Sequence, residues 1–411
     1  MPERLITPES VQLGPIDSAG SRGGPYSLRC DSLEQADAST VSLWKGFLGH
    51  HSNDDPMRDP EWLRGYFAEV QDVRFYSLYE GGRLCGLAPF LRKQWPMQWH
   101  LGPWVAAQFP LVRLRLLGSG FDFPPEPSAY DLLFRELAKA QDFQALYLEE
   151  IPLDSFLWIY LHESELIRKK FRLYQPRPAA PRPVLRLEGT FQQYMGKFNS
   201  KHRNTLNRKI KKLRDGALGE MRLVRYESPE EVPSFLAQAI EISRKTYQWA
   251  RYGRGLSAVD KIRKRVMFAA QHGWLRSYLL FCGGEARAFL LGYQYGGRFV
   301  LDEIGFDPDL ARYSVGTVLQ MLTVEDLFVC NRPHLFDLQE YGAYKEALCT
   351  DSYLEGRLFL FRPGAYATLL RSGHRVCALV DRTISSALQR SNLKTRIRQK
   401  LRGWSPRHTT K

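Results

Sequence analysis

Cysteine is scarce in this sequence, and its placement excludes the usual cysteine-based sites. The six cysteines stand far apart and form neither a CxxC pair nor a Cys/His cluster with the spacing of metal ligands. The pair His50-His51 is followed by Asn53, Asp54 and Asp55, but a single histidine pair in a polar loop is a weak metal signal. We therefore expect reduced, mostly buried thiols and no metal ion.

Long apolar runs are missing as well. No stretch approaches the roughly 18–20 uninterrupted apolar residues of a membrane span, and the start, MPERLITPES, has no apolar run like that of a secretion signal. We therefore expect a cytoplasmic protein. The 411 residues are 44% apolar and 25% charged, a globular composition that gives enough chain for two cores of about 150–200 residues each.

Acidic residues are absent from two stretches of the chain. Residues 197–214 contain eight Lys or Arg and no acid, and residues 382–411 contain nine and no acid. The total net charge is +14, so the remainder of the chain carries −3. The protein therefore has two basic elements on a nearly neutral body, which is not the pattern of a uniformly basic protein.

Strand-like and helix-like patterns alternate along the chain and predict a mixed α/β (α+β) fold. Runs rich in β-branched and aromatic residues flank glycine pairs that begin at Gly81, Gly283 and Gly296, which is typical of tight hairpins. Between such runs, apolar residues return at helical spacing, as in one helix expected from a Thr190 cap to Gly216. We expect mostly antiparallel sheets flanked by helices.

A proline-rich stretch, residues 175–184, marks the expected domain boundary. We predict a flexible N-terminal arm (1–29), two folded units (30–178 and 179–363) and a basic amphipathic C-terminal helix or tail (364–411). The segment RFYSLYEGGRLCGLAPFL in the first unit resembles RSYLLFCGGEARAFLLGY in the second. This indicates two copies of one α/β unit, although two unrelated hairpins can look alike by chance.

The segment DPDLARYSVGTVLQM places Gly316 where irregular chain gives way to a helix. The start of a helix offers unpaired N–H groups and the positive end of its dipole, and a glycine beside them lets a phosphate group approach closely. The loop can therefore bind an anion. The alternative is that Gly316 only eases a turn.

This region resembles the acyl-CoA-binding motif of the GNAT superfamily, (Q/R)xxGx(G/A), although neither Arg312 nor Tyr313 as leading residue completes that pattern. YSVGTVL, followed by FDLQEYGAYKEAL, is similar to the YSPGxxL and DFxxGxxxYK pattern of the CelD-like acetyltransferases of bacterial polysaccharide biosynthesis. That branch resembles the FemAB/FemX aminoacyltransferases, which join two GNAT-like units. The resemblance implies two tandem GNAT-like units, no metal, and acetyl-CoA or another acyl-CoA bound by the loop of Arg312, Tyr313, Ser314, Val315, Gly316, Thr317 and Val318.

Acyl transfer to an amine needs a base, a donor to the thioester carbonyl and an acid for the leaving thiolate. Strict alternation along the strand that ends at the loop puts Leu301, Glu303 and Gly305 on one face, and Asp302 and Ile304 on the other. We predict Glu303 as the base, because relatives often carry a glutamate on this strand. An acid that merely faces solvent is the alternative.

The remaining predicted site residues follow the same order along the chain. Asp337, Tyr344 and Tyr313 are further catalytic candidates, the tyrosines as acid or carbonyl donor, and their alternative is simple packing. Contact with the substrate is expected from Asp302, Glu340, Tyr341 and Lys345, and from the basic helix through Lys201 and Arg203.

Each basic element has two interpretations. The helix over 197–214 is either a solvated surface or a contact for a phosphate-bearing partner such as CoA, a nucleotide-linked sugar or tRNA. The C-terminal segment, with Leu393, Ile397 and Leu401 among basic residues, is either an interfacial helix at the inner surface of an anionic membrane or a flexible tail.

The sequence thus predicts an N-acyltransferase that moves an acyl group, most simply acetyl, to an amine of an amino sugar or polysaccharide precursor by direct attack in a ternary complex. No Cys or Ser stands beside a His as a covalent mechanism requires. The alternatives are a FemX-like aminoacyltransferase that uses charged tRNA, and a non-catalytic GNAT-fold module that binds nucleic acid or a membrane.

Overall fold

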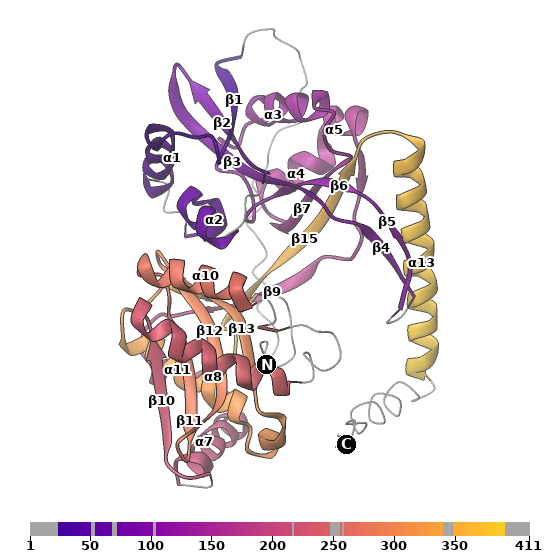
Figure 1. Ribbon diagram of the computed structural model, residues 1–411. Helices are drawn as coiled ribbons and strands as arrows, with labels where there is room; N and C mark the ends of the chain where they lie inside the picture. Colours follow the sequence, from indigo (N-terminus) through magenta and orange to yellow (C-terminus); the bar gives the residue numbers. More distant parts are fainter. Residues whose placement is uncertain are drawn as a thin grey trace. The chain divides into compact units, whose positions relative to one another are not determined.

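The computed structural model describes residues 24–50, 54–67, 72–101, 104–215, 218–246, 255–256, 259–339, 345 and 348–390 (Figure 1). It forms two compact units, each assembled from separate stretches of chain. Unit 1 comprises Met1–Cys30, Asp72–Pro178 and Gly356–Lys411, and unit 2 comprises Asp31–Gln71 and Ala179–Glu355. This differs from the predicted linear division, because residues 31–71 group with the later unit and residues 356–411 with the earlier one.

Unit 1 is a mixed sheet covered by helices. Its strands run in the order β1-β2-β3-β6-β7-β15, with β8 paired to the end of β15. Their bounds are β1 (Tyr26–Ser32), β2 (Asp72–Glu80), β3 (Arg83–Gln94), β6 (Val112–Leu116), β7 (Ala145–Pro152), β8 (Arg172–Tyr174) and β15 (Asp351–Phe361). Gly81 and Gly82 both have positive φ (54° and 84°), so the predicted β2–β3 hairpin is confirmed.

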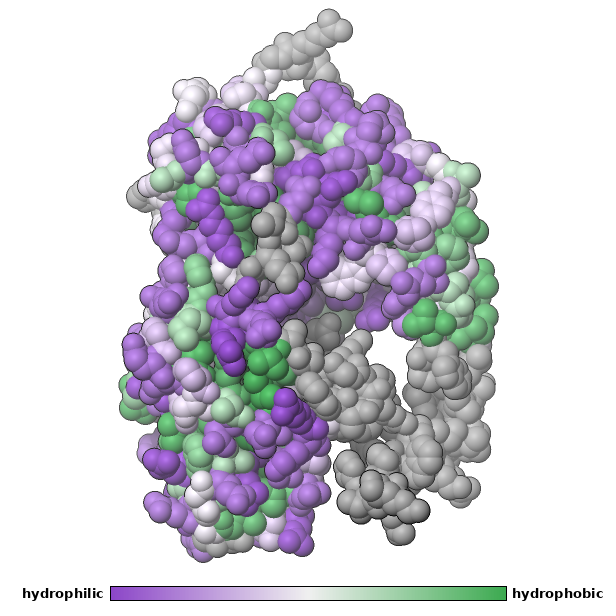
Figure 2. Space-filling view, viewed as in Figure 1, coloured by the Kyte–Doolittle hydropathy of each residue, from purple (hydrophilic) through white to green (hydrophobic). Residues whose placement is uncertain are grey.

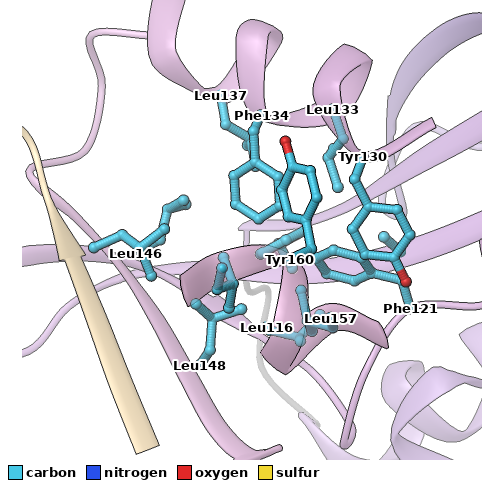
Figure 3. Packing of buried hydrophobic residues seen from close by; sticks show 14 of the residues in the cluster. Leu116, Phe121, Tyr130, Leu133, Phe134, Leu137, Leu146, Leu148, Leu157 and Tyr160 are labelled. Carbon is cyan, nitrogen blue, oxygen red and sulfur yellow. The ribbon is translucent and has the colours of Figure 1, made fainter. Parts of the chain in front are cut away.

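The core of unit 1 lies between this sheet and three helices, α3 (Pro127–Lys139), α4 (Phe156–Glu163) and α5 (Glu165–Lys170). The Tyr160 ring stacks on Phe134 there at 5.6 Å between centroids and contacts Tyr130 in a tilted arrangement at 5.1 Å (Figure 3). A second, two-stranded sheet, β4 (Met97–Leu101) and β5 (Trp104–Phe109), packs against the long helix α13 (Ala365–Arg390).

Unit 2 is built on an antiparallel meander. Strands β10 (Met221–Tyr226), β11 (Ser277–Cys282), β12 (Glu285–Tyr295) and β13 (Arg298–Phe306) follow one another across the sheet. Next to β13 comes β14 (Leu335–Asp337), which is parallel to it, then β9 (Ala180–Arg186) and the first residues of β15. The predicted fold of antiparallel hairpins, a helix and a short strand is therefore present.

The helices of unit 2 cover both faces of its sheet. Helix α11 (Val315–Val329) packs with α6 (Phe191–Gly196) and α7 (Ser200–Arg214) over one face of the meander. Helix α8 (Val232–Lys245) contacts β12 and β13, and α10 (Val259–Gln271) contacts α8. The remaining helical segments are α1 (Ala38–His50), η1 (Pro56–Arg58), α2 (Pro60–Tyr66), η2 (Pro229–Glu231) and η3 (Pro308–Tyr313).

Two expectations about local structure need correction. The helix predicted from Thr190 onward is two helices, because Asn199 caps the start of α7 while Thr190 forms the capping box of α6. The free cysteines are not mostly buried, since Cys282 is buried, Cys30 is exposed and the other four are half-buried.

None of the helices within the described residues is long and apolar enough to cross a membrane.

Candidate active site in unit 2

A β-bulge interrupts the pairing of β12 with β13. Leu291 lies opposite Glu303, but its neighbour Gly292 lies opposite Leu301. Between these two pairs β13 has one residue more than β12. Asp302 is this extra residue. Such a bulge changes which side chains share a face of the strand.

The bulge puts both acids of β13 on the same face. Leu301 and Ile304 pack in the cluster under α11, although strict alternation would separate them. Glu303 lies opposite Leu291, whose neighbour Leu290 belongs to that cluster, so Glu303 points to the other face. Asp302 also points away from α11, toward α10. The predicted separation of Asp302 from Glu303 is therefore wrong, because it assumed an unbroken pleat.

Arg265 of α10 holds the extra acid. Its guanidinium Nη2 lies 2.5 Å from the Asp302 carboxylate, and both side chains are four-fifths buried. The same guanidinium stacks over the rings of Tyr66 and Tyr293 at 5.0 and 5.9 Å. Sequence reasoning missed Arg265, because it lies among several basic residues of an amphipathic helix and looks like a solvated charge.

Glu303 is the acid beside this pair, and its environment suits proton transfer. Burial and, to a smaller extent, the negative charge of Asp302 raise its pKa to about 7, against the lowering effect of Arg265. A carboxyl group that titrates near neutral pH can take a proton from an ammonium group and release it again.

The edge of β13 opens next to this acid. The parallel pairing with β14 runs from Arg298 to Val300 and stops there. No strand among the described residues pairs with this edge beyond Val300. The backbone groups of β13 that face this edge beyond Val300 therefore have no strand partner within the described residues, and an extended ligand can pair with them there.

The predicted donor loop lies at the start of α11. Ser314 occupies the N-cap in the left-handed region (φ 56°) and makes no side-chain cap, while its carbonyl accepts from Val318 N–H. The N–H groups of Val315, Gly316 and Thr317 belong to the uncapped first turn. A Cβ on Gly316 would lie 2.9 Å from the Phe306 ring, so glycine keeps this turn close to the end of β13.

Positive charge surrounds the same turn. Lys212 of α7 lies over one side of Tyr313, with Nζ 4.7 Å from the ring centroid, and Arg312 lies 4.9 Å from it. Leu206 and Leu213 bury one side of α7 in the core, which turns much of its basic surface outward. The combination of free N–H groups, a helix dipole and two cations can bind phosphate.

Asp337 does not fit the catalytic role that the sequence predicted. It is 2% exposed and forms two hydrogen bonds with Arg182, at 3.1 and 2.8 Å, while Gln339 N–H donates to it at 2.8 Å. Arg182 also binds Glu355 at 3.1 Å. Burial opposes the charge of Asp337, but Arg182 and Arg298 lower its pKa. It is an ionised structural carboxylate that ties β14 to β9.

The other predicted residues have different outcomes. Lys345 donates from Nζ to the Leu338 carbonyl at 2.6 Å. Lys201 is exposed, and Arg203 is half-buried with Nη1 3.4 Å from the Phe198 carbonyl oxygen. The predictions for Glu340, Tyr341 and Tyr344 lie outside the described residues.

Two acids of the polar loop that resembled a metal site, Asp54 and Asp55, hydrogen-bond to backbone N–H groups. Asp54 accepts from Gly297 N–H at 3.2 Å and lies 3.0 Å from His334 Nε2, and Asp55 caps η1. His51 and Asn53 lie outside the described residues.

Comparison with known proteins bears on this site. Residues 200–343 match the family described as "Acetyltransferase (GNAT) domain". The GNAT acetyltransferase domain spans residues 200–343. The GNAT part of the resemblance seen in the sequence is thereby confirmed, and the matched residues include the bulged strand, the donor loop and α11. No curated protein matches the chain.

Solved structures share the fold over a longer stretch. A FemX crystal structure has a TM-score of 0.57 at 12% identity and covers 80% of this chain and 98% of its own. A conserved protein of unknown function from Bacteroides thetaiotaomicron has a TM-score of 0.50 at 10% identity and covers 79% and 98%. A tandem GNAT protein from the clavulanic acid pathway has a TM-score of 0.46 at 14% identity and covers 82% and 99%. The shared fold with FemX confirms the predicted mixed α/β fold.

Proposed function

We propose that unit 2 of this GNAT protein transfers an acyl group from an acyl-CoA, most simply acetyl-CoA, to the amine of an amino sugar or polysaccharide precursor. The observation that carries the proposal is Glu303, a half-buried acid with a pKa of about 7 on the bulged strand that leads to the donor loop. Phe306, which lies against the first turn of α11, is three positions further along the strand, a distance of about 10 Å.

The donor would lie along the open edge of β13 with its phosphates on the first turn of α11. The free N–H groups of that turn, with Lys212 and Arg312 beside it, supply the positive field for the phosphates. Because the pairing with β14 stops at Val300, the thioester can extend through the opening toward the face that carries Glu303.

On that face the reaction is direct. Glu303 takes the proton of the acceptor ammonium group, the amine nitrogen attacks the thioester carbonyl, and the C–S bond breaks. The nitrogen gives up its second proton as the C–S bond breaks, so the products are an amide and a CoA thiolate that takes up one proton. Tyr344 remains our proposed donor of that proton, and Tyr313, held between Lys212 and Arg312, remains a proposed alternative.

The basic surface of α7 favours a second acyl donor, an aminoacyl-tRNA. Lys201, Arg208, Lys211, Lys212 and Arg214 are exposed on it, and none of them pairs with an acid among the described residues. Such a surface could bind the phosphates of a charged tRNA, and the chain shares its fold with FemX. We keep the aminoacyl-tRNA donor as the alternative to acyl-CoA.

The deciding experiment measures free thiol release from acetyl-CoA with a panel of amino sugars and other amines, alongside the melting temperature with CoA or with charged tRNA. Acyl-CoA turnover that is lost in Glu303→Gln supports the proposal. Stabilisation by charged tRNA alone would select the alternative donor. Stabilisation without turnover on any amine would mean that the domain only binds.

A further inference from the structure

We propose that helix α13 of unit 1 docks the protein on the surface of an anionic lipid bilayer. The helix presents a stripe of exposed apolar side chains, and a row of arginines borders this stripe. The inference concerns a surface remote in sequence from the GNAT domain, and it stands whether or not the proposed reaction is correct.

The stripe follows one side of the helix. Leu369, Val376 and Leu379 are 51%, 61% and 64% exposed, and Tyr366 and Val380 are 37% and 38% exposed. Their spacing of three, four and seven residues puts them on one face over about 20 Å of helix. Figure 2 shows apolar surface over this helix, which is the yellow helix of Figure 1.

The neighbouring side of α13 is fixed to unit 1, so the stripe keeps its direction. Leu370 is fully buried in a cluster with Met97 and Phe361. Gly373 lies against the Trp99 ring, and His374 hydrogen-bonds to the Tyr174 hydroxyl. These contacts prevent α13 from rotating about its axis, so the stripe stays exposed.

Charge selects the partner. By helical spacing, Arg371 and Arg375 follow one border of the stripe, four residues apart, and the sequence has Arg382 seven residues further on. The sequence continues from there to residue 411 with eight more Lys or Arg and no acid. Apolar side chains bordered by arginine are the combination that inserts into the headgroup region of an anionic bilayer.

An exposed tryptophan near the same helix adds a second anchor. Trp95 is 49% exposed, and Lys93 and Arg113 lie 5.9 and 6.0 Å from its ring centroid. The backbone N–H of Trp95 donates to the Leu111 carbonyl. The hydroxyl of Tyr366, on α13, donates to the carbonyl of the adjacent Pro110. Tryptophan and tyrosine with nearby cations are enriched where protein meets lipid headgroups.

The test is co-sedimentation of the full chain with vesicles of phosphatidylcholine alone, or of about three parts phosphatidylcholine to one part phosphatidylglycerol. We expect binding to the anionic vesicles that weakens with salt, and much weaker binding to the neutral ones. The double variant Leu369→Glu/Leu379→Glu should lower the partition coefficient at least about tenfold, since it replaces two inserted side chains by repelled charges. Val376→Glu is a second, independent variant of the stripe.

Leu43→Glu is the matched control, because Leu43 is 46% exposed on α1 of the other unit. This control should bind vesicles like the wild type, and all variants should keep the wild-type melting temperature. Equal binding by wild type and stripe variants would show that the basic residues act alone and would overturn the proposal. So would a wild-type dimer, seen by light scattering, that the stripe variants convert to a monomer that binds no lipid.

Discussion

Asp302 and Glu303 are adjacent in the chain and yet point to the same face of β13, because Asp302 is the extra residue of a β-bulge. Arg265 pairs with the first acid, whose pKa burial raises, and burial with the charge of Asp302 raises the pKa of the second to about 7. The bulge thus creates a pair of carboxylates with different tasks, one that shapes the local field and one that can exchange a proton.

Replacing Glu303 by Gln should lower kcat/KM about 10²–10⁴-fold, because the amide cannot take the ammonium proton. In the wild type, kcat/KM should rise by up to about tenfold per pH unit below pH 7 and level off above it, since the base must be ionised and its pKa is about 7. Thiol release across pH 5.5–8.5 measures both effects, with Glu220→Gln, an exposed acid of the same unit, as the control. A flat wild-type profile, or full activity in Glu303→Gln, would remove Glu303 as the base.

The same variant should be more stable than the wild type at alkaline pH. The folded pKa of Glu303 lies above its ordinary value of 4.5, so the folded protein binds this proton more tightly than the unfolded chain, and stability falls as pH rises through 4.5 to 7. Gln cannot ionise, so Glu303→Gln should gain up to about 3 kcal/mol at pH 8 and nothing near pH 4. Urea unfolding of both proteins at the two pH values checks this, and a pH-independent difference would contradict it.

Asp302→Asn should shift the acidic limb of the profile of kcat/KM against pH to lower pH. The charge of Asp302 raises the pKa of Glu303, so its removal lets Glu303 ionise at lower pH, while the amide oxygen can still accept from Arg265. Arg265→Met should move the limb upward for the opposite reason. A merely structural role for this pair would reduce stability and leave the position of the limb unchanged.

Asp337→Ala should act on stability and not on the chemical step. It would leave Arg182, which is 6% exposed, without its main partner, and breaking such a buried pair costs about 3–5 kcal/mol. Chemical unfolding should show this loss, while kcat at a temperature well below the transition should stay within about threefold of the wild type. Arg186→Ala is a control with a partly exposed ion pair, Arg186–Asp351, and should cost less than about 1 kcal/mol.

Two glycines near the site should respond differently to alanine. A methyl group on Gly305 would meet the ring of Phe289, which is 1% exposed and cannot move away, so Gly305→Ala should cost about 2 kcal/mol or more. On Gly316 it would meet Phe306, which is 39% exposed and can swing outward. Gly316→Ala should therefore keep its stability to within about 1 kcal/mol and raise the KM for acyl-CoA. Equal destabilisation of both variants would contradict this.

Local pattern was enough to predict the hairpins and the helix that begins beside Gly316, whereas the choice of Glu303 came from the family resemblance and stays a prediction. Glycine pairs with positive φ and a helix that begins beside Gly316 are local features, so the sequence carries them directly. The faces of β13 were not predictable, because nothing in LDEIG signals that Asp302 is an extra residue. The pairing of Asp337 with Arg182 joins residues 155 positions apart and is decided by tertiary packing.

The division of the chain between the units has a consequence for synthesis. Unit 1 begins first, but it includes Gly356–Lys411, whereas the last stretch of unit 2 ends at Glu355. Since residues leave the ribosome in order, the unit that carries the proposed acyltransfer site has all of its chain before the earlier unit does. The nascent protein should therefore complete the folding of unit 2 first. Residues 72–178 should complete their fold only after β15 and α13 have been synthesised.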